Sequence, residues 1–187
     1  MLYVEIIFHG RGGQGAVTAA NVLAGAAVRE GKWSQAFPHF GAERRGAPVR
    51  AYARISDEPI SRHSQIYAAD IAVVLDDKLF ELVDIVSTVK KDGVIIVNTA
   101  EQKIDLDKGK RNLYCVDAVS IAKELGLIVA GWPVVNTAML GAFSALTGIV
   151  SLESIVEEIK ANWPGKTGEA NAEAARRAYK LVSKCGV

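Results

Sequence analysis

Four glycines lie within six residues near the start of the chain, and their spacing is one that nucleotide-binding loops use. The segment consists of Gly10, Arg11, Gly12, Gly13, Gln14 and Gly15. It follows a run of strand-forming residues and precedes a stretch of small, helix-forming ones. A glycine-rich turn between a strand and a helix presents backbone N–H groups at the helix N-terminus, where they attract anions such as phosphate.

The spacing G-x-G-x-x-G lacks one part of a dinucleotide site. Such a site needs an Asp or Glu about 20 residues further on, at the end of the second strand, to bind the ribose hydroxyls. The residues at that place are Gln35-Ala36-Phe37-Pro38-His39. Three interpretations stay open: an NAD(P) site, which the missing acid disfavours, a purely structural tight turn, and a contact with a phosphate or with a partner's carboxylate.

Other polar residues are expected at the same edge of the fold. Asp76 and Asp77 directly follow an apolar run. They could bind magnesium, but acids that begin a helix and complement its dipole are the favoured interpretation. His9 and His39 have no partner nucleophile, and no G-x-S-x-G motif occurs, so we expect structural or interface roles for them. No residue of this chain is predicted to be catalytic.

Two further groups are candidate binding residues. Asn136 and Thr137 are expected at the start of a helix, where Asn136 can cap the helix or point into a ligand crevice. The turn-rich segment FPHFGAERRGAP combines aromatic residues with adjacent arginines, a composition typical of protein interfaces and also compatible with a solvated loop. The interface candidates in this segment are Phe40, Glu43, Arg44, Arg45 and Pro48.

Composition narrows the class of protein. The chain has 187 residues, 50% of them hydrophobic, with a net charge of +1, so no basic field indicates nucleic-acid binding. No apolar run is long enough for a membrane span and no signal peptide is visible, which predicts a cytoplasmic protein that binds no membrane. Cys115 and Cys185 form no metal-binding motif, and we expect two reduced thiols, with Cys115 buried in a strand.

Short apolar segments alternate with helix-like ones along the chain. This order predicts a single domain, residues 1–187, with a Rossmann-like α/β fold: a doubly wound, mostly parallel sheet with helices on both faces. Alternation over residues 49–55 predicts a strand whose Arg50, Tyr52 and Arg54 face solvent or a partner. Strands are expected at residues 4–8, 32–36, 49–55, 71–75, 94–97 and 113–116, and helices at 18–30, 79–86, 119–125, 137–146, 152–163 and 171–184.

Three stretches together resemble one family. They are GRGGQGAVTAANVLA, FGAERRGAPVRAYARI and VVNTAMLGAF, and the tail KTGEANAEAARRAY is similar as well. In this combination and order the chain resembles the gamma subunits of the 2-oxoacid:ferredoxin oxidoreductases, also called pyruvate synthase gamma chains. The ERRGAPV segment is closer to the pyruvate and branched-chain forms than to the 2-oxoglutarate forms.

The resemblance implies a function that the residues alone do not. These enzymes convert a 2-oxoacid and CoA to acyl-CoA and CO2 and pass electrons to ferredoxin. Thiamine diphosphate with magnesium, and iron–sulfur clusters, are implied in the partner chains, which are the alpha, beta and delta-type subunits. The gamma chain is implied to bind no cofactor alone, to pack on the thiamine-binding chains and to help accommodate CoA. The alternative is a stand-alone Rossmann-type nucleotide-binding module.

Overall fold

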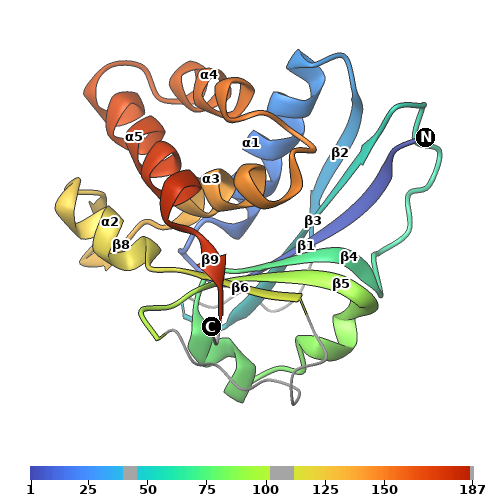
Figure 1. The fold of residues 1–187 in the computed structure, drawn as a ribbon, viewed down its shortest axis with the longest axis horizontal. Helices are drawn as coiled ribbons and strands as arrows, with labels where there is room; N and C mark the ends of the chain where they lie inside the picture. The colour runs from blue at the N-terminus through green and yellow to red at the C-terminus, as the bar shows by residue number, and fades with distance from the viewer. Residues whose placement is uncertain (40–45, 102–111, 186–187) are drawn as a thin grey trace.

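The computed structural model describes residues 1–39, 46–101 and 112–185, and it is built around a seven-stranded mixed sheet (Figure 1). The strand order in the sheet is β2-β3-β1-β4-β5-β6-β9. A small hairpin of two further strands lies apart from it. The strands are β1 (Tyr3–Arg11), β2 (Trp33–Pro38), β3 (Pro48–Ser56), β4 (Ala69–Val74), β5 (Val89–Asn98), β6 (Asn112–Val116), β7 (Ile128–Val129), β8 (Trp132–Pro133) and β9 (Ser183–Lys184).

One face of the sheet carries a layer of α-helices, and the other carries short 3-10 helices (Figure 1). The main core lies between the sheet and the α-helical layer. A second cluster lies under the 3-10 helices. The helices are α1 (Ala16–Arg29), α2 (Ala118–Glu124), α3 (Asn136–Thr147), α4 (Leu152–Asn162) and α5 (Lys166–Leu181), and the 3-10 helices are η1 (Asp77–Glu81) and η2 (Val86–Thr88).

The centre of the sheet is parallel, as predicted. Strand β4 pairs in parallel with β1 and with β5, and β5 pairs in parallel with β6. These strands are apolar on both faces because both faces are covered. Their carboxyl ends therefore meet at one edge, which is where a doubly wound sheet binds its ligands.

Strand β3 lies between β1 and β2 and is antiparallel to both. The prediction that its Tyr52 and Arg54 face solvent or a partner is wrong, because both are buried. Residues 57–68 fold back across this face, and Ile66 packs on Tyr52. Of the three residues, Arg50, near the start of the strand, stays partly exposed.

Arg54 is held by a buried ion pair. Its Nε lies 2.9 Å from Oε1 of Glu5 on β1, and its guanidinium lies over the ring of Phe37, 5.2 Å from the centroid. The same guanidinium donates to the carbonyls of Arg62 and Ser64, at 3.2 and 2.5 Å. The covering segment is therefore fastened to β3 by the side chain that was expected to face outward.

Two predicted helices differ from the observed ones. Residues 79–86 form the end of η1 and the start of η2 instead of one α-helix. Asp84 accepts the backbone N–H of Ser87, which competes with a continuous α-helical ladder. The last helix begins at Lys166, five residues before the predicted start, and packs along α3 and α4.

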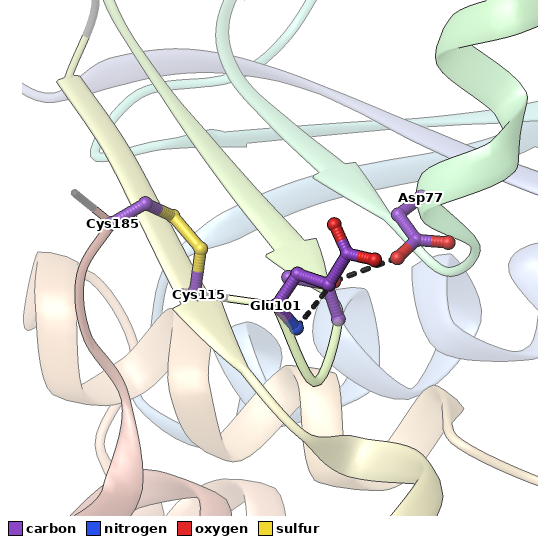
Figure 2. Close-up of a disulfide and its surroundings, with 5 residues drawn as sticks. Asp77, Glu101, Cys115 and Cys185 are labelled. Carbon is purple, nitrogen blue, oxygen red and sulfur yellow. Dashed lines mark hydrogen bonds between the residues drawn. A yellow bond between two sulfur atoms is a disulfide. The ribbon is translucent and has the colours of Figure 1, made fainter. Parts of the chain in front are cut away.

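The cysteines are not two reduced thiols, so that expectation is wrong. Cys115 and Cys185 form a disulfide across 70 residues of sequence (Figure 2). The reason is the short C-terminal strand β9, which runs antiparallel to the edge strand β6 and brings the two Cα atoms to 5.3 Å.

Candidate functional site

The glycine loop is closed by its own hydrogen bonds. The backbone N–H of Arg11 donates to Oε1 of Gln14 at 2.7 Å, and the N–H of Gln14 donates back to the carbonyl of Arg11 at 2.9 Å. The N–H of Gly12 reaches the carbonyl of Ala47 at 2.9 Å. The loop is thus a rigid strand-to-helix turn, attached to the residues that lead into β3.

Asp76 anchors the loop from the next strand of the sheet. Its Oδ2 accepts from Arg11 Nε at 2.7 Å and from Gln14 Nε2 at 3.3 Å. Its Oδ1 accepts the backbone N–H of Lys78 at 3.1 Å, which caps η1. These contacts support the interpretation of Asp76 as an acid at a helix start. The side chain of Arg11 is occupied by this contact and by the carbonyl of Gly46, at 3.2 Å.

Part of the loop stays open. Gly13 is exposed, has φ +96°, and has nothing within 4 Å of the place a Cβ would take. Gly15 is the N-cap of α1, and no side chain caps it. Because the first N–H groups of a helix have no intrahelical partner, this end of α1 presents donors next to Gly13. These N–H groups are the feature of the described loop that an anion would use.

The structure places Asn136 against the glycine loop. Asn136 Nδ2 lies 3.4 Å from the carbonyl of Gly15. A Cβ built on Gly15 would lie 2.5 Å from the same Asn136 nitrogen, and Gly15 has φ +82°, so the position favours glycine. Asn136 is not the N-cap of α3, which is Val135. Thr137 points elsewhere: its hydroxyl donates to Oδ1 of Asn171 on α5 at 2.9 Å. Asn136 therefore supports the loop from behind, whereas Thr137 joins two helices.

Two residues of the same edge were not predicted. Asn98, at the end of β5, donates to the carbonyl of Leu75 and accepts the N–H of Ala118, at 2.9 and 3.0 Å. Thr99 donates to Asp77 Oδ2 at 2.6 Å and accepts the N–H of Glu101 at 3.0 Å. Their position directly after the apolar run VIIV was the signal that could have identified them.

A cavity of about 230 Å³ opens beside the loop, and His9 contributes to its wall. The hydroxyl of Thr88 donates to the carbonyl of Ile85 at 2.6 Å, so it must accept from His9 Nε2, 3.2 Å away. Burial, together with the charge of Arg50, lowers the pKa of His9 to about 3. The ring is therefore neutral near pH 7 and is a poor general base. The described lining residues are His9, Gly10, His39, Pro48, Val49, Arg50, Leu79 and Val83.

His39 takes part in hydrogen bonds that connect parts of the fold. Gln65 Nε2 donates to Nδ1 of His39 at 2.9 Å and to the hydroxyl of Tyr52 at 2.7 Å. This contact ties the covering segment to the end of β2. Of the predicted interface residues, Pro48 is exposed at the start of β3. Phe40, Glu43, Arg44 and Arg45 lie outside the described residues.

The strand order also bears on nucleotide binding. In a dinucleotide site the second strand lies directly beside the first and brings its acid to the ribose. Here β3 separates β2 from β1, and β2 ends in Pro38 without an acid. The glycine loop therefore has the spacing of a dinucleotide-binding motif, but no described strand with a ribose-binding acid lies directly beside β1 at the place of β2.

Similarity of the sequence to known proteins identifies the family. The sequence matches the family model described as pyruvate ferredoxin/flavodoxin oxidoreductase over residues 5–181. The chain belongs to this family. It is 52% identical to pyruvate synthase subunit PorC of Methanothermobacter thermautotrophicus, covering 98% of both chains.

Two other relatives agree. The chain is 52% identical to the common gamma subunit of the pyruvate/ketoisovalerate oxidoreductases of Pyrococcus furiosus, covering 94% of this chain and 95% of that one. The crystal structure of pyruvate oxidoreductase subunit PORC (EC 1.2.7.1) from Thermotoga maritima matches with a TM-score of 0.79 and 40% identity, covering 98% of each chain. The prediction of a gamma subunit of a 2-oxoacid:ferredoxin oxidoreductase is confirmed.

Two observations concern metal binding and membrane spans. Within residues 1–39, 46–101 and 112–185, no three His, Cys, Asp or Glu side chains come close enough together to hold a metal ion. In the same part of the chain, every helix is too short or too polar to cross a bilayer.

Proposed function

We propose that this chain completes a multi-subunit enzyme that converts pyruvate and CoA to acetyl-CoA and CO2 and reduces ferredoxin. The observation that carries the proposal is the match, along nearly the whole chain, to subunits of pyruvate synthase. The described residues are compatible with it, because Asp76, Asp77 and Thr137 each bind another side chain of this chain by an ion pair or a hydrogen bond. Residues 1–187 act in this proposal as one gamma-type domain.

The chemistry is assigned to partner chains. Thiamine diphosphate with magnesium supplies the carbanion chemistry when bound, and iron–sulfur clusters carry the electrons. The proposed partners are the alpha, beta and delta-type subunits, with ferredoxin as acceptor through the complex. Phe40, Glu43, Arg44, Arg45 and Pro48 are proposed to face a partner. The cytoplasmic location stays a prediction from the sequence.

The proposed contribution of this chain is to accommodate CoA at the glycine loop. CoA carries phosphates, and the open donors at Gly13 and at the start of α1 suit one of them. Gln14 and Arg11 shape the loop from inside, and Asn136 supports it from behind. Asp76 neutralises Arg11, so the attraction for phosphate comes from backbone N–H groups and not from a free side-chain charge.

The subunit assignment is tested by a tagged pull-down under anaerobic conditions. The eluate is assayed for reduction of viologen that depends on both pyruvate and CoA. We expect thiamine-binding and iron–sulfur chains to elute together with this activity. Elution of the chain alone, with micromolar affinity for NAD(P) or FAD in a calorimetric titration, would support the stand-alone nucleotide-binding module instead.

The loop is tested with Gly13→Leu in the assembled complex. Gly31→Leu is a matched control, because Gly31 also has a positive φ, at +75°, and nothing within 4 Å of a built Cβ, but it follows the far end of α1. Leucine keeps the backbone N–H, but its side chain would occupy the open space beside Gly13 and keep a phosphate away from the loop N–H groups. Loss of one charge-assisted hydrogen bond in this way predicts a rise of about tenfold or more in the KM for CoA with Gly13→Leu only. An unchanged KM with normal assembly in both variants would contradict the CoA contact. Failed assembly of Gly13→Leu alone would move the loop to a partner interface.

A further inference from the structure

The two cysteines join the C-terminal end of the chain to the edge of the sheet. Cys115 lies in the edge strand β6 and is 4% exposed, and Cys185 directly follows β9. Among the described residues, β9 meets β6 at two Cα pairs, Tyr114 with Lys184 and Cys115 with Ser183. The N–H of Cys185 adds one hydrogen bond to the carbonyl of Leu113, at 3.0 Å. The disulfide crosses between the tail and β6 in Figure 2.

Among the described residues of this tail, Val182 and Cys185 are partly buried against the two core clusters. Ser183 and Lys184 are exposed, and Leu181, just before them, is 61% exposed. The helix that precedes the tail is fixed differently: α5 buries Ala172, Ala175 and other small residues against its neighbours. A short strand with few buried contacts opens locally at low free-energy cost. Without the disulfide, the tail can leave the sheet while α5 stays in place.

The two cysteines differ in exposure. Cys115 is buried in the core cluster under η1 and η2, whereas Cys185 is only partly buried at the sheet edge. Thiol–disulfide exchange requires an external thiolate to reach one sulfur of the bond. The accessible target is therefore Sγ of Cys185, and Cys115 is the leaving group.

We propose that Cys115 and Cys185 are a reversible thiol–disulfide pair that fastens β9 to the sheet edge, with a dithiol as its reductant. One thiolate of the dithiol attacks Cys185 Sγ, the bond to Cys115 breaks, and Cys115 leaves as a thiolate that takes up a proton. The second thiol of the dithiol then attacks the first sulfur of the same dithiol, which is bonded to Cys185 Sγ in the mixed disulfide. The Cys185 thiol is released. Two electrons and two protons pass to the chain, and the dithiol becomes a disulfide.

Reduction changes the surface that the chain presents. Once residues 183–185 leave, β6 exposes unpaired N–H and C=O groups on its outer side, and such an edge pairs readily with another strand. The reduced and oxidised chains therefore differ in one local surface and in little else. This inference does not depend on the function proposed above, because its readouts are thiols and amide hydrogens.

The first test measures the two thiols in the complex. The purified complex is equilibrated with mixtures of reduced and oxidised dithiothreitol, quenched with acid and alkylated, and the peptides with Cys115 and Cys185 are quantified by mass spectrometry. We expect both to become alkylated together, as one two-electron couple. Thiols that stay reduced at every mixture, a disulfide that no dithiol reduces in the folded complex, or two cysteines that respond separately would each overturn the proposal.

The second test measures release of the tail by hydrogen exchange of the full-length chain. We expect the amides of residues 183–185 to exchange at least tenfold faster after reduction and in Cys185→Ser, while those of α5 stay protected. Ser183→Ala is the matched control, because it changes an exposed residue of β9 and keeps the disulfide. If Cys185→Ser does not fold, Cys115→Ala replaces it and the reduced natural chain gives the same comparison. Equal exchange with and without the disulfide would overturn the proposal.

Discussion

Replacing Arg54 by Met is expected to lower the free energy of unfolding by about 4 kcal/mol. Arg54 is 0% exposed, and its guanidinium lies 2.9 Å from Glu5, which is 7% exposed. Removing one partner of a buried ion pair costs about 3–5 kcal/mol, because the other charge stays buried without compensation. Domains are stable by only about 5–15 kcal/mol, so the loss is a large part of the total.

The remaining contacts of Glu5 cannot compensate. Arg62 Nη1 is 3.7 Å from the same carboxylate, but its side chain is 60% exposed, and such pairs contribute about 0–1 kcal/mol. The carbonyls of Arg62 and Ser64 lose their donor as well. Both residues are exposed, so water can replace that donor at little cost.

The double variant Arg54→Met with Glu5→Leu separates charge burial from packing. Two apolar side chains remove the unpaired carboxylate, and we expect most of the stability to return, to within about 1–2 kcal/mol of the natural chain. Arg62→Met is the control, because it removes the exposed partner of the same carboxylate, and it should cost less than about 1 kcal/mol.

Urea unfolding of the isolated chain at pH 7, followed by circular dichroism, measures all three variants. The midpoint should fall most in Arg54→Met, partly recover in the double variant and hardly move in Arg62→Met. A cost below about 1 kcal/mol for Arg54→Met would refute the reasoning, since it would mean that the pair is not desolvated. A double variant as unstable as the single one would show that the guanidinium acts through its carbonyl contacts instead.

Two further predictions concern His9 and Gly141, which are also buried. Unfolded His9 takes up a proton below about pH 6.5, whereas the lowered pKa of about 3 keeps the folded ring neutral, so stability should fall on acidification between these values by up to about 1.4 kcal/mol per pH unit. Unfolding of His9→Gln at several pH values should lack this component, and an unchanged pH dependence would contradict it. Gly141→Ala places a Cβ inside contact with the carbonyl of Ala175, where α3 meets α5, and should cost about 1–3 kcal/mol. Gly25→Ala in α1 displaces only the flexible Glu158 side chain and should leave the melting temperature within a few degrees, and equal melting of the two variants would argue against a tight α3–α5 contact.

The parallel centre of the fold was predictable because its signals are local. Each central strand is an apolar run bounded by polar residues, and alternation with helices gives a parallel sheet. The glycine loop was predictable for the same reason, since its strand, turn and helix are adjacent in sequence. The contacts that hold the loop in place were not predictable, because Asp76, which binds Arg11 and Gln14, lies more than 60 residues away in the chain.

The errors came from contacts that distant segments make. Alternation along β3 shows two faces but not that residues 57–68 cover one of them, so Arg54 was expected to be exposed. The same limit applies to Cys115 and Cys185, which 70 residues separate and no spacing motif connects. Whether the glycine loop touches CoA depends on other chains, and no pattern in this sequence contains that information.

The order of contacts along the chain has a consequence for biosynthesis. β1, α1, β2 and β3 pair among themselves within the first 56 residues, so this part can take shape while the ribosome is still translating the rest. α5 and β9 come last, yet they cover α3 and close the sheet edge beside β6. The nascent chain therefore carries an α3 that α5 does not yet cover until residues 166–181 have emerged from the ribosome.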